Sequence, residues 1–218
     1  MKNFAWSYSR LKNFETCPKR HFHYDIAKDV QETGGFSEGM EMHRAFEARV
    51  STGTKLPLPY SQHETWITQL ISAPGETYAE QKLALDKDFK PASWRGNAWF
   101  RAVIDFCKVR PESIVIVDYK SGKPIEDDTQ LALQAATVLH HLGDAVRVRS
   151  AFLFTGYDRL ISHVYTREDI PRIWSQVLPR VRKLEKAMEM QDYPPKPSGL
   201  CVKYCSVTHC PYHGVGSR

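Results

Sequence analysis

The chain has 218 residues, of which 42% are hydrophobic and 25% charged, and its 30 lysines and arginines exceed its 25 acidic residues by five. These are ordinary values for a globular protein, and they exclude a disordered chain, a collagen-like repeat and a coiled coil. The longest apolar runs, 114–117 and 151–154, are far shorter than the ~20 residues that span a bilayer, so no membrane segment is predicted. A net charge of +5 permits a nucleic-acid partner without requiring one.

Five cysteines lie at positions 17, 107, 201, 205 and 210. The N-terminus has neither the apolar segment nor the small-residue cleavage site of a secretory signal, which predicts an intracellular protein. In a reducing compartment, clustered cysteines indicate metal binding or catalysis before they indicate disulfides.

The predicted elements alternate between helices and strands along the chain. Helical spacing of apolar residues predicts helices around 11–14, 40–50 and 66–71, with a loop over 51–61. Strands are predicted over 77–86, 97–109 and 114–120, then a helix over 129–142 and two more strands over 146–155 and 161–165. A long amphipathic helix follows over 168–190, in which Pro179 is expected to produce a kink or a break. This order predicts an α/β fold with a mixed sheet.

The most informative stretch is the hairpin RAVIDFCKVRPESIVIVDYKSGK. If residues 110–113 form its turn, Val109 pairs with Ile114 and, four positions further along, Asp105 lies opposite Asp118. Directly opposed side chains of antiparallel strands share a face, with Cβ atoms about 4.5–5.5 Å apart. Two carboxylates so placed repel each other, and a divalent cation between them removes the repulsion because hard cations take oxygen ligands. The hairpin therefore predicts a metal site.

Lys120 follows two residues after Asp118 and lies on the same strand face, about 6.6 Å along the strand. An ammonium group there can stabilise charge that develops on a phosphate, or orient and deprotonate a water molecule. Two acids that hold a metal beside a lysine suit metal-assisted phosphodiester hydrolysis. A lone D-x-K is more often an ordinary surface ion pair, and only the opposed Asp105 and the apolar flanks favour a site here.

Six segments in this chain order resemble motifs of the PD-(D/E)XK nuclease superfamily, in particular its RecB-like branch. They are SYSRLKNFETCPKRHFHY, GMEMHRAFE, YAEQKLAL, AVIDFCKV, VDYKSGK and DTQLALQAATVL. The resemblance implies a restriction-endonuclease-like α/β core with a central mixed sheet flanked by helices. It also implies one nuclease domain over 1–218, with its core over about 37–166, a long helix over about 168–190 and a Cys-rich, metal-bound clasp over 193–218 joined to Cys17.

The same resemblance implies roles for single residues. His43, Asp105 and Asp118, together with the backbone carbonyl of Tyr119, would ligate Mg²⁺ or Mn²⁺, and Lys120 would be the catalytic lysine. Taken alone, a histidine on a helix face, such as His43, is more often a semi-buried side chain with its hydrogen bonds satisfied than a metal ligand.

Two further residues gain roles in this way. Glu80 would be a secondary acid near the metal or its water, and Gln130 would orient DNA or the catalytic lysine. The sequence departs from the branch at Ala102, where a glycine is expected, and at Gln134, where a tyrosine is expected. Without the resemblance, the polar stripe that contains Gln130 and Gln134 is typical of a solvated helix face.

Three cysteines near the C-terminus, Cys201, Cys205 and Cys210, have the spacing C-x3-C-x4-C. Three thiolates within ten residues can hold one metal centre, and a closed site usually takes four ligands. By resemblance to iron–sulfur members of the branch, Cys17 would be the fourth ligand of a 4Fe-4S cluster, although the middle cysteine of the tail is displaced by one. Zinc is the alternative, since histidines stand near Cys17 and in the tail. Cys107 is predicted to be a small buried hydrophobic residue.

The function that the resemblance implies is a metal-dependent DNA nuclease, in most cases an exonuclease of recombination or repair, from a bacterium or phage and with a recombination or replication protein as a partner. One alternative is a catalytically silent DNA-binding module with a structural metal clasp, and another is a nuclease that acts on RNA. The aromatic residues considered for stacking on unpaired bases are Trp6, Trp94, Trp99 and Tyr119.

Overall fold

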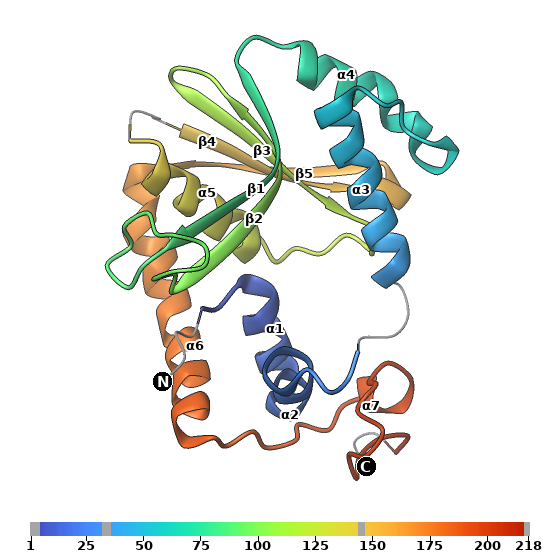
Figure 1. The fold of residues 1–218 in the computed structure, drawn as a ribbon, viewed down its shortest axis with the longest axis vertical. Helices are drawn as coiled ribbons and strands as arrows, with labels where there is room; N and C mark the ends of the chain where they lie inside the picture. The colour runs from blue at the N-terminus through green and yellow to red at the C-terminus, as the bar shows by residue number, and fades with distance from the viewer. Residues whose placement is uncertain (1–4, 32–35, 144–146, 216–218) are drawn as a thin grey trace. The chain divides into compact units, whose positions relative to one another are not determined.

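The computed structural model describes residues 5–31, 36–143 and 147–215. They form two compact units (Figure 1). Unit 1 contains Ala5 and Glu38–Ile173, and unit 2 contains Trp6–Ser37 and Trp174–Arg218. Most of the predicted core thus falls in unit 1 and the predicted Cys-rich tail in unit 2, while residues 216–218 of that tail lie outside the described residues.

Unit 1 is built on a five-stranded sheet in the order β1-β2-β3-β4-β5. The strands are β1 (Glu76–Leu85), β2 (Phe100–Val109), β3 (Ser113–Lys120), β4 (Arg147–Phe154) and β5 (Arg159–Thr166). Strands β3 and β4 are parallel and the other neighbouring pairs are antiparallel, which confirms the predicted mixed sheet. Helix α5 (Thr129–His141) connects the two parallel strands, as a crossover requires. The predicted start of β4 at Val146 lies outside the described residues.

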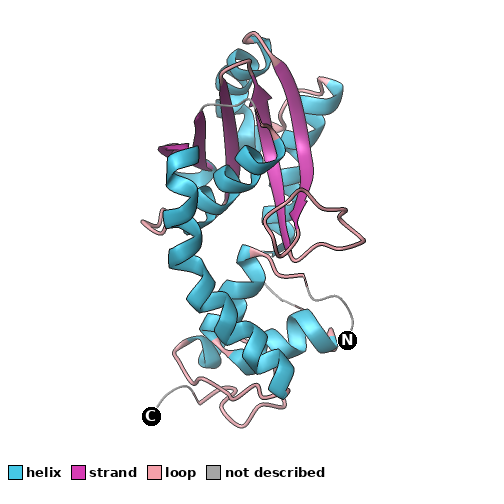
Figure 2. Ribbon diagram, turned by 90° about the vertical axis from the view of Figure 1, so that its left-hand side faces the viewer, coloured by secondary structure: helices cyan, strands magenta, loops and turns pink. Residues whose placement is uncertain are grey.

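Helices cover the sheet on both faces (Figure 2). On one face, α3 (Phe36–Thr52) and α4 (Glu64–Ser72) form a core with the strands. Its buried members include Met42, Phe46 and Ile67 from the helices and Phe106, Val117, Tyr119, Ala151 and Leu153 from the strands. On the other face, α5 buries its apolar side chains Leu131, Leu133, Ala135, Ala136, Val138 and Leu139. Burial of each leucine, valine, isoleucine, phenylalanine or methionine in these layers contributes about 1.5–3 kcal/mol, so the sheet is held between two apolar layers.

The predicted register of the β2–β3 hairpin is confirmed. Val109 pairs with Ile114, and the amide of Arg110 donates to the carbonyl of Ser113 at 3.0 Å to close the turn. The ladder continues to the pair of Phe106 and Val117 and stops there, immediately before the two aspartates. The active-site candidates therefore stand where regular pairing of β2 and β3 ends.

Unit 2 combines segments from both ends of the chain. Helix α1 (Tyr8–Thr16) begins at Ser7, whose hydroxyl accepts from the amide of Arg10, and Pro18 then occupies the first turn of α2 (Pro18–His21), where a missing N–H costs nothing. A π-helix follows over Phe22–Ala27, and the tail contains the short helix α7 (Leu200–Lys203).

The long helix α6 (Ile170–Met190) starts in unit 1 and passes into unit 2 after Ile173. It remains one helix through Pro179, so of the two predicted outcomes, a kink or a break, the break does not occur. In unit 2 its buried stripe includes Val177, Val181 and Leu184, and the free energy of this burial offsets the ~3 kcal/mol that an internal proline costs.

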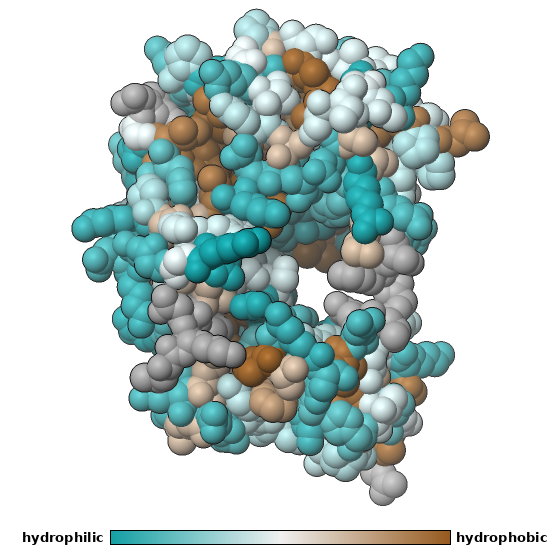
Figure 3. All heavy atoms as spheres, viewed as in Figure 1, coloured by the Kyte–Doolittle hydropathy of each residue, from teal (hydrophilic) through white to brown (hydrophobic). Residues whose placement is uncertain are grey.

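None of the described helices is both long and apolar enough to cross a membrane. The face drawn in Figure 3 is mostly hydrophilic, and its apolar residues lie in separate patches.

Candidate active site

Three acids lie at facing positions on three neighbouring strands of unit 1: Glu80 on β1, Asp105 on β2 and Asp118 on β3. They are called the acid row below. The β1–β2 ladder pairs Ala79 with Phe106 and Gln81 with Ile104, but it omits the intervening pair of Glu80 and Asp105. Glu80 has a left-handed backbone, with φ +49°. Because a side chain in this conformation costs about 1–3 kcal/mol, it persists only where the surrounding structure enforces it.

The interruption redirects the side chain of Asp105. Ile104 and Cys107 both line a cavity beneath α5. Phe106, which immediately follows Asp105 and precedes Cys107, packs in the core on the α3 face. Strict alternation would place Ile104 and Phe106 on one face, so the alternation shifts by one residue at this point. The expectation that Asp105 and Asp118 share a face is therefore wrong, because it assumed regular alternation through the site.

On the α3 side, His43, Glu80 and Asp105 form a compact group. Nδ1 of His43 lies 3.2 Å from Oδ2 of Asp105 and 4.0 Å from Oε1 of Glu80, and one ligand atom from each residue fits within 4.8 Å of the others. The same Asp105 oxygen accepts from the backbone amide of Tyr119 at 2.9 Å. Two carboxylates and one imidazole at this spacing could bind a divalent cation.

The pKa values of this group reflect its surplus of negative charge. Burial lowers the pKa of His43, but its hydrogen bond with Asp105 and the charges of the nearby acids outweigh burial and leave the pKa raised. Burial raises the pKa of Glu80, and the charge of Asp105 raises it further. A cation would relieve this repulsion, so the residues present fit a divalent metal.

On the α5 side, the carboxylate of Asp118 is enclosed by donors. Its Oδ2 lies 2.6 Å from Nζ of Lys120, and its Oδ1 accepts from the amides of Gln130 and, at 2.9 Å, Gln134. Lys120 also donates to Oε1 of Gln130 at 2.9 Å. Burial raises the pKa of Asp118 although the charge of Lys120 opposes the shift. This cluster presents an ammonium group at the edge of the acid row.

All the side chains predicted from the sequence to be catalytic or to ligate Mg²⁺ or Mn²⁺ lie in or beside the acid row, and they form two groups. His43, Glu80 and Asp105 form the group with ligand spacing, while Asp118 contacts Lys120 and the two glutamines. The metal-ligand roles of Asp118 and of the Tyr119 carbonyl stay predictions.

Sequence reasoning missed the contribution of Gln134. Its amide contacts Asp118 and it is almost fully buried, so the interpretation of this helix stripe as a solvated face is wrong for Gln134. The available signal was its position four residues after Gln130, which places both amides on one helix face.

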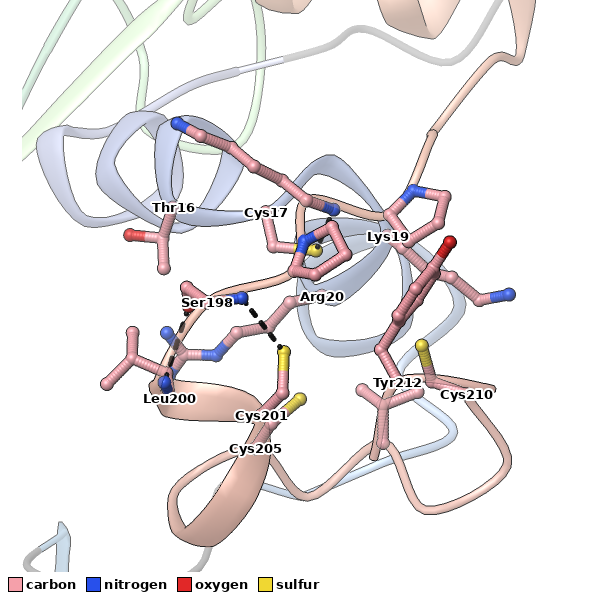
Figure 4. A pocket seen from close by; sticks show the side chains of 14 residues that line it. Thr16, Cys17, Lys19, Arg20, Ser198, Leu200, Cys201, Cys205, Cys210 and Tyr212 are labelled. Carbon is pink, nitrogen blue, oxygen red and sulfur yellow. Dashed lines mark hydrogen bonds between the residues drawn. The ribbon is translucent and has the colours of Figure 1, made fainter. Parts of the chain in front are cut away.

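In unit 2, the four cysteines Cys17, Cys201, Cys205 and Cys210 line one pocket (Figure 4). Backbone amides contact two of the sulfurs: Lys196 N lies 3.3 Å from Sγ of Cys17, and Ser198 N lies 3.4 Å from Sγ of Cys201. These four residues are all described, and no three of their sulfurs lie within 4.8 Å of one another. The pocket therefore joins the early cysteine to the tail without the spacing of a single-ion site.

Two of the histidines considered as zinc ligands, one near Cys17 and one in the tail, contact each other. Nε2 of His23 lies 3.2 Å from Nε2 of His209, and Nδ1 of His23 contacts Asp29 at 3.0 Å. Cys107 is buried in unit 1 as predicted, and burial raises the pKa of its thiol to about 12.

Three of the four aromatic residues considered for base stacking are unsuited to it. Trp6, Trp99 and Tyr119 are at most 6% exposed and belong to the interior. Trp94 is partly exposed, and the guanidinium of Arg101 lies 5.3 Å from its ring centre.

Comparison with known proteins gives the following matches. The family model of the PD-(D/E)XK nuclease superfamily matches residues 5–215. No curated protein matches the chain. A solved structure of a candidate exonuclease from Eubacterium rectale is 12% identical, with a TM-score of 0.55, and the match covers 95% of this chain and 86% of that one. The solved structure of SSO0001 is also 12% identical, with a TM-score of 0.45 over 98% of this chain and 88% of that one.

At such low identity the solved structures support the fold alone, and the family model is the stronger finding. It extends over nearly the whole chain, including the strands that carry the acid row. The chain therefore belongs to the PD-(D/E)XK nuclease superfamily.

Proposed function

We propose that the protein is a divalent-metal-dependent DNA nuclease of the RecB-like branch and acts as an exonuclease. The observation that carries the proposal is the placement of Lys120 2.6 Å from Asp118, beside a group of one imidazole and two carboxylates at ligand spacing. Motif order along the chain supports the branch. The candidate exonuclease among the solved structures shares the fold, and its activity is the one that we propose for this chain.

In this proposal His43, Glu80 and Asp105 hold Mg²⁺ or Mn²⁺, with Asp118 as a further ligand. The cation would supply Lewis-acid activation of the scissile phosphate and its water. Asp118 is fixed by Lys120 and by two amides, so it keeps one orientation while substrate enters. Fixed geometry of this kind lowers the reorganisation that the reaction demands.

The chain's own groups then manage charge and protons. The Lys120 ammonium faces the scissile phosphate and stabilises the negative charge that develops on its oxygens as water attacks phosphorus and the bond to the leaving oxygen breaks. The carboxylate oxygen of Glu80 that does not hold the cation accepts the proton that the attacking water loses, and solvent water returns a proton to the leaving oxygen.

Incubation with linear DNA and Mn²⁺ tests this function. Lys120→Ala should cleave at least 10²-fold more slowly than the wild type. Lys87→Ala is the matched control, because Lys87 is an exposed lysine of the β1–β2 loop. Equal cleavage by the wild type and Lys120→Ala would overturn the site. Binding of DNA without any cleavage would instead indicate a silent binding module, and preferential cleavage of RNA would redirect the substrate.

For unit 2 we propose that Cys17, Cys201, Cys205 and Cys210 hold a 4Fe-4S cluster. The four cysteines line one pocket, which supports a single shared centre with four thiolate ligands. The two backbone amides that contact sulfur support a thiolate site, because such hydrogen bonds stabilise cluster ligands. Brown protein with iron and acid-labile sulfide is expected after anaerobic purification, and colourless protein with one zinc per chain would overturn the cluster.

A further inference from the structure

Strands β2 and β3 separate beyond the pair of Phe106 and Val117, and side chains bind the backbone groups on the separated stretches. On β3, the amide of Tyr119 donates to the carboxylate of Asp105 at 2.9 Å. On β2, the carbonyl of Val103 accepts from Nε2 of Gln134 at 3.2 Å. The opening between the strands is therefore bridged by one acid from the sheet and one amide from α5.

Gln134 connects this opening to the carboxylate of Asp118. Its amide nitrogen donates to the Val103 carbonyl on β2 and, at 2.9 Å, to Oδ1 of Asp118 on β3. A primary amide has two hydrogens, and both are used in these contacts. The side chain is only 4% exposed, so the two bonds form away from competing water.

Gln130, one turn earlier on α5, differs in its anchoring. It donates to Asp118 and accepts from Lys120, so both its partners are side chains of β3 and neither ties it to the backbone of β2. Gln134 is instead tied to the backbone of β2 through Val103. Of the two amides, Gln134 therefore fixes Asp118 relative to the strand that carries Asp105.

We propose that Gln134 is a positioning residue that sets the separation of Asp118 from Asp105 across the opening, and thereby the affinity of the site for its divalent cation. This inference rests on the proposed function, because it takes Asp118 as a ligand. Loss of a group that orients a metal ligand typically weakens metal binding 10–100-fold. Gln134→Met retains the length of the side chain and its burial while it removes both donors.

A second helix-to-strand contact on α5 supplies the matched control. His141 contacts the carbonyl of Ala84 on β1 through Nε2 at 2.9 Å and has no contact with the acid row. His141→Leu therefore removes one bond between α5 and the sheet without touching Asp118. Both variants should remain folded with lower Tm, as measured by circular dichroism.

Mn²⁺ affinity of the DNA-free protein, measured by calorimetry, separates a positioning role from a merely structural one. We expect Gln134→Met to weaken binding at least tenfold and to raise by a similar factor the Mn²⁺ concentration that gives half-maximal cleavage, whereas His141→Leu changes neither. Unchanged affinity in folded Gln134→Met, or equal loss in both variants, would overturn the inference.

The two proposals fail separately. If the wild type cleaves DNA and Gln134→Met has the same Mn²⁺ dependence, only the inference about Gln134 is overturned. If the wild type binds Mn²⁺ in a Gln134-dependent way but cleaves nothing, only the nuclease function is overturned. A wild type that binds no Mn²⁺ would overturn both.

Discussion

Glu80 and Asp105 face each other on adjacent strands at a position that the ladder between those strands omits. The register is the same on either side of the omission, so no residue has been inserted and the distortion is local. Glu80 takes up the distortion with its left-handed φ of +49°, and Asp105 turns toward His43. The strained backbone of Glu80 thus lowers local stability, and it places the carboxylates of Glu80 and Asp105 beside the imidazole of His43.

Replacement of Glu80 by glycine should therefore stabilise the protein and inactivate it. Glycine adopts positive φ without the ~1–2 kcal/mol penalty, and the carboxylate that repels Asp105 is removed. We expect Tm to rise by about 2–4 °C and Mn²⁺-dependent cleavage to fall at least tenfold. Gln191→Gly is the control, because Gln191 also has positive φ, at +51°, but lies outside the acid row. A lower Tm for Glu80→Gly would contradict the assignment of strain.

Lys108 is a buried lysine with a structural role. Its Nζ donates to the carbonyl of Ile71 at the end of α4 and to the hydroxyl of Thr77, both at 2.8 Å, and burial lowers its pKa. Lys108→Met should lower the free energy of unfolding by about 1–3 kcal/mol, because the buried acceptors lose their donor. Urea denaturation measures the change, and Lys87→Met should be neutral. Loss of cleavage in folded Lys108→Met would show that the residue does more than support α4.

Acid should weaken unit 2 through Asp25. Burial raises the pKa of Asp25, but hydrogen bonds from His21 and Asn13 outweigh burial and leave the pKa below its ordinary value of 3.8. The folded state therefore binds this proton less readily than the unfolded state, so the stabilisation is complete above pH 3.8 and is lost as the pH falls through the lower, folded value.

Denaturation midpoints between pH 2.5 and 6 test this linkage. The wild type should lose stability below about pH 4 more steeply than Asp25→Asn, and the exposed Asp192→Asn should behave like the wild type. Parallel curves for Asp25→Asn and wild type would exclude Asp25 as the source.

Removal of one cysteine should separate the cluster ligands from the core cysteine. Cys17→Ser should lose most of the bound iron or zinc, because one of four ligands in the unit 2 pocket is gone. Cys107→Ala should keep full metal content, because Cys107 lies in the interior of unit 1. Metal per chain is measured by elemental analysis. Equal metal content in wild type and Cys17→Ser would remove Cys17 from the site.

The β2–β3 hairpin was predictable because local chemistry determines it. A turn over 110–113 determines which residues pair, and the confirmed pairing of Val109 with Ile114 follows from it. The same local reasoning failed at Asp105. The shift in alternation depends on the backbone of Glu80, on a strand about 25 positions earlier in the chain, and a glutamate carries no signal for positive φ.

Long-range contacts account for the other differences. The burial of Gln134 could not be read from its polar stripe, because the partners that justify it, Val103 and Asp118, come from two different strands. The continuity of α6 through Pro179 likewise depends on a buried stripe whose burial is a property of the folded chain.

Unit 2 draws on two stretches, Trp6–Ser37 and Trp174–Arg218, and nearly all of unit 1 is encoded between them. A ribosome that adds roughly 5–20 residues per second takes about 10–40 s to travel from Cys17 to Cys201. The thiol of Cys17 therefore waits for its partners while the whole sheet of unit 1 emerges and can fold. On the proposal that these cysteines hold one metal centre, a cell short of that metal would accumulate chains whose sheet is complete and whose cysteine pocket is still open.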